Sequence, residues 1–122
     1  MIRFVYHPDL MKEIGKMVKK VRTVEESFKA FEKLCERQFD PENPQQCIAP
    51  AKLHRVTQNS TWTMWKTELV LVRSGLRPNQ FPRLRFVVQG VNIGFLCMGT
   101  HVDNYQDGIM DRLAFDRVTD IF

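Results

Sequence analysis

Residues 81–105 read FPRLRFVVQGVNIGFLCMGTHVDNY, and this stretch decides the fold that we expect for the chain. It holds two apolar runs, 84–88 and 91–98, separated by a glutamine-glycine break. Two such runs around a turn signal predict a pair of strands joined by a tight turn. A small polar cluster follows directly after Gly99, and we expect function to lie there. Its members are Thr100, His101, Asp103, Asn104 and Tyr105.

The composition is that of an ordinary globular protein: 122 residues, 43% hydrophobic and 26% charged. A chain of this size buries roughly two thirds of its unfolded surface without disulfides or metal, so we expect one domain over residues 1–122. The three cysteines form neither a Cys-x-x-Cys pair nor a Cys/His cluster, so we expect no metal, no cofactor and a reducing, cytoplasmic location. No apolar run approaches the roughly 20 residues that cross a bilayer, so we expect no membrane association.

Positive charge gathers in the middle of the chain. Residues 1–40 sum to +2, residues 41–100 to +5 and residues 101–122 to −3. The central segment is also the one whose pattern predicts sheet, and a basic sheet face suits a nucleic-acid backbone. The alternative is a scattered, solvated surface, since a net charge of +4 is modest for a nucleic-acid binder.

The N-terminal third predicts a strand over residues 2–6 and then a helical hairpin. We expect His7 to be a turn residue and Asp9 to cap a first amphipathic helix. Thr23 with Glu26 forms a capping-box pattern that predicts a second helix from residue 24. Acids are mixed among the lysines of both helices, so we expect these lysines to form a solvated face. The apolar stripe of the second helix is Phe28, Phe31, Leu34 and Cys35.

The remainder predicts strands over residues 51–56 and 62–72, the two strands of the opening stretch, and a terminal helix. Asp107 and Asp111 suit the first turn of that helix, which either covers the basic sheet or extends away from it. The expected fold is α+β: an N-terminal strand and a helical hairpin, packed on a mainly antiparallel sheet of about four to five strands, with a C-terminal helix.

Three stretches of the sequence resemble motifs of a known protein family. Residues 65–69 (WKTEL) place an aromatic residue before a lysine, residues 84–88 (LRFVV) place an arginine before hydrophobics, and residues 99–105 (GTHVDNY) place a histidine and then an aromatic after a glycine. With the order of the elements, they resemble the RelE/ParE-like toxin superfamily of type II toxin–antitoxin systems, which has the RelE-type mRNA interferase fold. The resemblance implies metal-independent cleavage of mRNA or of ribosome-bound mRNA, and a cognate antitoxin protein as partner.

Site residues follow where this sequence matches the family pattern. The resemblance implies catalytic places for Lys66, Arg85, His101 and Tyr105. Glu68 stands where RelE-like members are basic, which removes a positive charge from the site. That departure favours the alternative, a non-catalytic toxin-fold binding protein of the gyrase-inhibitor type or an inactive homologue bound by an antitoxin.

The chemistry of the residues is compatible with RNA cleavage, which needs a base, an acid and fixed cations. His101 changes charge near neutral pH and is therefore the best candidate for proton transfer. The alternative for His101 is a polar residue that closes a strand. Tyr105 either stacks on a base, donates a proton or fills the edge of the core.

Arginine donors match phosphate oxygens well, so we expect phosphate binding at several arginines. Arg83 and Arg85 alternate with Leu84 and Phe86, which places both arginines on one outward face and the apolar pair under the helices. The alternative is an ordinary solvent face. By the same alternation we expect Trp62 and Trp65 on opposite faces, one buried and one exposed. Further candidates for phosphate binding are Arg55, Arg73 and Arg77.

Overall fold

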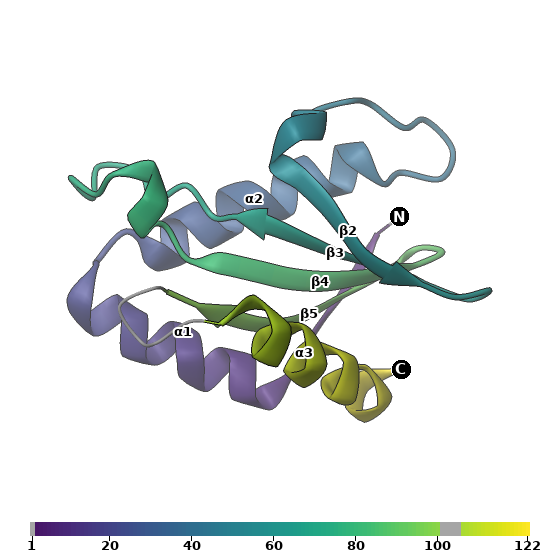
Figure 1. The fold of residues 1–122 in the computed structure, drawn as a ribbon. Coiled ribbons are helices and arrows are strands. Elements are labelled where there is room, and N and C mark those ends of the chain that lie inside the picture. The colour runs from purple at the N-terminus through teal and green to yellow at the C-terminus, as the bar shows by residue number, and fades with distance from the viewer. Residues whose placement is uncertain (1, 101–105) are drawn as a thin grey trace.

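The computed structural model describes residues 2–100 and 106–122. Over these residues the chain forms one five-stranded sheet with helices on both faces (Figure 1). The predicted α+β class and the order of its elements are confirmed. The elements are β1 (Arg3–Tyr6), α1 (Pro8–Lys20), α2 (Val24–Gln38), β2 (Leu53–Gln58), β3 (Thr63–Glu68), β4 (Arg83–Gln89), β5 (Asn92–Gly99) and α3 (Asp107–Ile121), with short 3-10 turns at Pro50–Lys52 and Pro78–Gln80.

The sheet runs in the order β1-β5-β4-β3-β2 and is mainly antiparallel, as predicted. Only β1 is parallel to its neighbour, β5, and it pairs there with residues 92–95. The tight turn predicted between the two apolar runs joins β4 to β5 and contains Gly90 with a φ of 60°. Because β1 ends early, the last residues of β5 continue past it toward α1 and α3.

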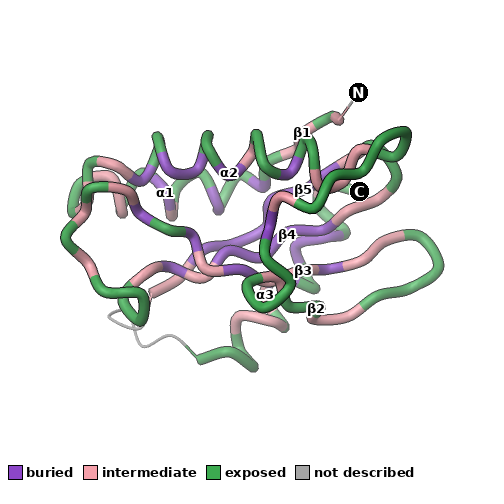
Figure 2. Tube along the Cα trace, turned by 90° about the horizontal axis from the view of Figure 1, so that it is seen from above, coloured by how far each residue is buried: buried purple, intermediate pink, exposed green. Residues whose placement is uncertain are grey.

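Most residues of β4 and β5 are buried on both faces of the sheet, which explains why the two strands read as nearly continuous apolar runs. Helices α1 and α2 cover one face and α3 covers the other (Figure 2). On the α1/α2 face, Leu84 and Phe86 are fully buried, as predicted. Rings of Phe28 and Phe95 meet there edge to face at 4.9 Å. The α3 face holds Met64, Val87, Leu96, Cys97, Ala114 and Val118.

Helix α1 begins at Pro8, one position before the cap that the sequence predicted. His7 is the N-cap: its Nδ1 accepts a hydrogen bond of 3.0 Å from the Asp9 backbone N–H. Its Nε2 therefore carries the ring proton and donates to Asp120 at the end of α3, at 2.8 Å. The prediction of Asp9 as cap was wrong because proline, with its preset φ, takes the first helical position.

Helix α2 begins at Val24, as predicted, but the capping box does not form. Thr23 has φ −88° and ψ 6°, outside the extended geometry of a capping residue. Its hydroxyl is buried without a hydrogen-bond partner in the part of the chain that the structure describes. The apolar stripe predicted for α2 is buried except for Leu34, which is 37% exposed.

The two tryptophans lie on opposite faces of the sheet, as predicted. Trp65 packs on the α1/α2 face 6.2 Å from Phe39, and Trp62 packs on the α3 face 6.1 Å from Phe115. Both are half-buried, so the expectation of one buried and one exposed ring was wrong. Each lies near the β2 edge of the sheet, where a single aromatic neighbour covers part of it. Strand β3 ends at Glu68, four residues before the predicted limit.

Two glycines provide a test of this backbone. Gly15 lies inside α1 with nothing within 4 Å of an added methyl group. We expect Gly15→Ala to raise the free energy of unfolding by up to about 1 kcal/mol, because alanine is the better helix former. Gly90→Ala should lower it by roughly 1 kcal/mol, because Gly90 has a positive φ that a β-carbon disfavours. Urea denaturation measures both; a lower midpoint for Gly15→Ala would contradict the helix.

Candidate functional site

A row of basic residues crosses β2, β3 and β4 on the α3 face of the sheet. His54 is the register partner of Lys66, and Lys66 is the partner of Arg85. Direct partners on neighbouring strands point to the same face, so the three residues form one line, which we call the basic row. Like charges opposite each other destabilise a sheet, so this row requires nearby acids.

Helix α3 supplies those acids from its first turns. The Arg85 Nε donates to Asp111 at 2.6 Å, and the Arg85 Nη2 donates to Asp107 at 2.9 Å. Lys66 Nζ also donates to Asp107, at 3.3 Å. The C-terminal acidic segment therefore lies over the basic face of the sheet. The sequence alone did not decide between this placement and a segment that extends away.

The side chain of Arg85 has no exposed surface. It shares a face with Arg83, as predicted, but the expectation that both point outward was wrong. The α3 face of β4 carries Val87 as well as the two arginines, and Asp107 and Asp111 of α3 pack against Arg85. Arg83 is also largely covered, with 17% of its side chain exposed.

Glu68 pairs with Arg83 rather than with Lys66. Its Oε1 lies 3.3 Å from Arg83 Nη2, and its Oε2 lies 3.9 Å from Lys52 Nζ. Arg83 and Glu68 are themselves register partners on β4 and β3. The carboxylate that departs from the family pattern thus neutralises the arginine one step along the sheet from the basic row.

The three other predicted phosphate-binding arginines lie away from the basic row. Arg55 is the register partner of Trp65, so it points to the α1/α2 face. Arg73 forms an ion pair with Glu26 of α2. Arg77 precedes the short turn Pro78–Gln80, in the loop between β3 and β4. The structure therefore brings together Lys66, Arg83 and Arg85 but not these three.

His101 and Tyr105 lie outside the described residues, together with Asp103 and Asn104. Their chain neighbours can be placed. Gly99 is the register partner of Arg83, and Thr100 and Gln106 line a cavity between α1 and α3.

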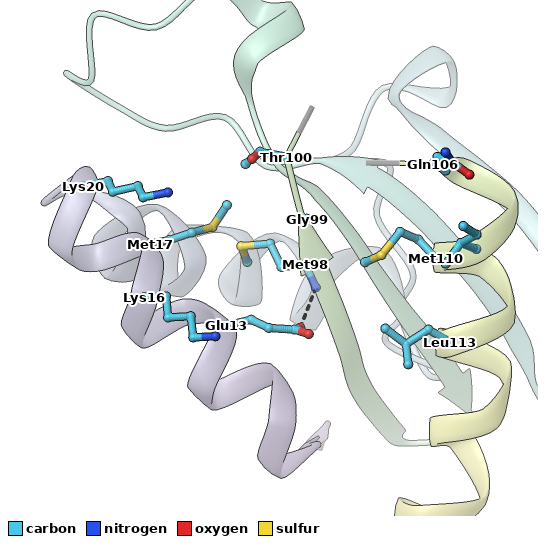
Figure 3. A pocket seen from close by; sticks show the side chains of 11 residues that line it. Glu13, Lys16, Met17, Lys20, Met98, Gly99, Thr100, Gln106, Met110 and Leu113 are labelled. Atoms are coloured by element: carbon cyan, nitrogen blue, oxygen red, sulfur yellow. Dashed lines mark hydrogen bonds between the residues drawn. The ribbon is translucent and has the colours of Figure 1, made fainter. Parts of the chain in front are cut away.

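This cavity has a volume of about 510 Å³, and we call it the α1–α3 groove (Figure 3). Sequence reasoning assigned the α1 lysines to a solvated face and so missed that two of them, Lys16 and Lys20, line the groove. Helical spacing alone could group these residues on one face, but it could not show that α3 stands opposite. The lining residues are Glu13, Lys16, Met17, Lys20, Met98, Gly99, Thr100, Gln106, Ile109, Met110 and Leu113.

A partly buried ion pair between α1 and α3, Glu13 with Arg117, was not predicted from the sequence. Arg117 of α3 donates to the Glu13 carboxylate at 3.0 Å and to the Leu96 carbonyl at 2.8 Å. Glu13 in turn accepts the Met98 backbone N–H at 3.1 Å. The two side chains thus satisfy backbone groups of β5 beyond the end of β1, and they tie α1 to α3.

The described residues contain no group of three or more His, Cys, Asp or Glu side chains that could hold a metal ion. They also contain no helix of the length and apolarity that a membrane span requires. In comparisons with known proteins, no family model, no curated protein and no solved structure matched the chain. Fold and site together define an α+β domain in which two acids of a helix pair with Lys66 and Arg85 of the basic row.

The ion pairs under α3 make a stability prediction. Asp107→Asn combined with Asp111→Asn should lower the free energy of unfolding by about 3 kcal/mol, because it removes the two carboxylates that, among the described residues, pair with the buried Arg85. Arg85→Met should cost less than about 1.5 kcal/mol, since an apolar side chain leaves no buried charge. Urea denaturation measures the free energy of unfolding of each variant.

Asp116→Asn, in an exposed pair with Arg112, is the matched control and should change the free energy of unfolding by under about 0.5 kcal/mol. Equal effects of the double variant and the control would contradict this role.

The cysteines make a reactivity prediction. Burial raises the pKa of the Cys97 thiol to about 12, and it raises the pKa of Cys35 further. A raised pKa leaves little thiolate near neutral pH, and thiolate is the reactive form. We expect iodoacetamide to label the half-exposed Cys47 first and the other two only after unfolding, as peptide mass spectrometry would measure. Rapid labelling of Cys97 in the folded protein would contradict the packing of α3.

Proposed function

We propose that this chain is the toxin component of a type II toxin–antitoxin system with a RelE/ParE-like fold, and that it cleaves mRNA without a metal. The observation that carries the proposal is the register of β3 on β4. It sets Lys66 opposite Arg85, with Arg83 one step along on the same face. Arg83 is itself opposite Gly99, so these cations lie beside the strand end that leads to His101.

In the proposed reaction, the 2′-oxygen of a ribose bonds to the adjacent phosphorus as the bond from phosphorus to the 5′-oxygen breaks. A base takes the 2′-hydroxyl proton and an acid protonates the leaving 5′-oxygen. His101 serves in proton transfer, and Tyr105 stacks on a base or donates a proton. Lys66 and Arg85 hold the phosphate, whose negative charge increases in the transition state.

RNA would have to compete with the protein's own acids. Asp107 contacts both Lys66 and Arg85, and Asp111 contacts Arg85. Because the side chain of Arg85 has no exposed surface, a phosphate reaches it only after the first turn of α3 has moved aside. The Asp107 side chain is 61% exposed, which favours replacement of its carboxylate by a phosphate. Water already surrounds this carboxylate and hydrates it after it leaves the cations.

One observation favours a second candidate, a non-catalytic toxin-fold binding protein such as a gyrase inhibitor or an inactive homologue bound by an antitoxin. Arg85 is fully buried against two carboxylates, and Arg83 is paired with Glu68. If these pairs persist, the row stabilises the fold and no phosphate binds to it.

Induced expression in a bacterial host separates the two candidates. The toxin proposal expects growth arrest with truncated messages, and relief of both by His101→Ala. With purified protein and RNA, His101→Ala should lower the cleavage rate by about a hundredfold or more, the usual contribution of a general acid or base. Lys66→Ala should also lower it, whereas Lys12→Ala, at an exposed position on α1, is the charge-matched control and should not.

Other outcomes decide against this proposal. Growth arrest with intact RNA and a DNA-damage response would support the gyrase-inhibitor alternative. Harmless expression of the unaltered chain would contradict a toxin of either kind.

A further inference from the structure

We propose that the rings of Trp62 and Phe115 form a base-stacking subsite for single-stranded RNA, on the same face of the sheet as the basic row. The inference rests on the proposed function, because it assigns a second part of the same RNA-binding surface. The basic row contacts the phosphates of the strand, and the aromatic pair contacts one of its bases.

Helix α3 leaves the edge of its own face of the sheet partly open. The helix packs on β5 and β4, while β3 and the edge strand β2 lie to one side of it. We call this open strip the β2–β3 shelf. His54 is exposed and Lys66 is partly exposed at one end of the shelf, and the half-buried Val56 and Trp62 lie further along it.

Two contacts place α3 alongside the shelf. Asp107 contacts Lys66 at 3.3 Å, and the ring of Phe115 lies 6.1 Å from the ring of Trp62. Asp107 and Phe115 are eight residues apart, or about 12 Å along a helix. Lys66 and Trp62 are four residues apart, or about 13 Å along a strand. The two lengths agree, so the helix flanks the shelf from the cation to the aromatic pair.

The aromatic pair keeps ring surface available to a base. The planes of the two rings meet at 66°, and such an edge-to-face contact covers at most one face of one ring. Phe115 is 50% exposed and Trp62 is half-buried. Every base has a flat π-face, and stacking on aromatic side chains binds unpaired bases with little dependence on sequence. The pair therefore suits one base of a single strand.

Charge and spacing are consistent with this occupant. Beside Phe115 on α3, the exposed Arg112 is paired with Asp116 at 3.5 Å, so the charge near the rings is balanced. A neutral base is compatible with such a surface, whereas a phosphate requires a cation such as Lys66. At the 3.4 Å spacing of stacked nucleotides, about four of them span the distance from Lys66 to Trp62. A short stretch of RNA thus reaches both parts of the surface.

Tryptophan fluorescence tests the proposal, because the chain has two tryptophans and they lie on opposite faces of the sheet. Trp65→Phe leaves Trp62 as the reporter, and Trp62→Phe leaves Trp65. The probe is a short 2′-O-methyl oligouridylate, which the proposed reaction cannot cleave because its 2′-oxygen carries no proton. We expect saturable quenching in the Trp65→Phe protein and little in the Trp62→Phe protein. The same backbone without bases should quench neither.

Two phenylalanine variants sharpen the test. Phe115→Ala should weaken binding of the oligouridylate about fivefold or more, the loss expected when one base loses its stacking partner. Phe122→Ala is the matched control, because Phe122 is 38% exposed at the end of the same helix but lies beside Gly94 of β5. This control should leave the affinity within about twofold.

Fluorescence anisotropy of a labelled oligouridylate measures the affinity and separates this inference from the proposed function. Three results would overturn the subsite while RNA binding stands: a rise in anisotropy without quenching of Trp62, equal quenching by the base-free backbone, and equal effects of Phe115→Ala and Phe122→Ala. No rise in anisotropy with RNA would contradict both the subsite and the RNA-binding surface.

Discussion

The guanidinium of Arg85 is the charge on which the arrangement of this domain depends. Its side chain has no exposed surface, and a buried charge is tolerated only when it is paired and hydrogen-bonded. Asp111 and Asp107 provide that pairing at 2.6 and 2.9 Å. Helix α3 must therefore place its first turns over β4. Because Asp107 also contacts Lys66, the same contact relieves the repulsion between the two neighbouring cations.

Polar contacts hold α3 at its middle and its end as well. Arg117 binds Glu13 of α1, and Asp120 accepts a hydrogen bond from the ring of His7. Both contacts join α3 to α1, one inside that helix and one at its N-cap, so charge positions α3 along its length and apolar packing lies between the charges. Gly94 permits close approach at the far end, where an added β-carbon would lie 2.5 Å from Ile121. The placement of α3 in turn creates the second wall of the α1–α3 groove.

The same carboxylates connect stability with the proposed function. While they hold Lys66 and Arg85, these two cations are paired and Arg85 has no surface that a phosphate reaches. An RNA backbone supplies negative charge of its own and could replace them, at the cost of moving the first turn of α3. In the function that we propose, the choice between a catalytic toxin and a binding protein is a competition between two sets of anions for one arginine and one lysine. Glu68 favours the state in which the protein's own acids hold these cations, because it neutralises the nearby Arg83.

The sequence by itself determined the order of the elements, the β4–β5 turn and the shared face of Arg83 and Arg85, because side chains alternate along a strand with a period of two. The register of β3 on β4 then placed Lys66 and Glu68 on that same face. Only the tertiary structure decided whether that face meets water or a helix. Alternation distinguishes two faces without saying what covers either. The ion pair of Glu13 with Arg117 joins residues 104 positions apart, and no local pattern encodes such a contact. Burial of charge is a property of the assembled fold, since it depends on which distant acid arrives beside it.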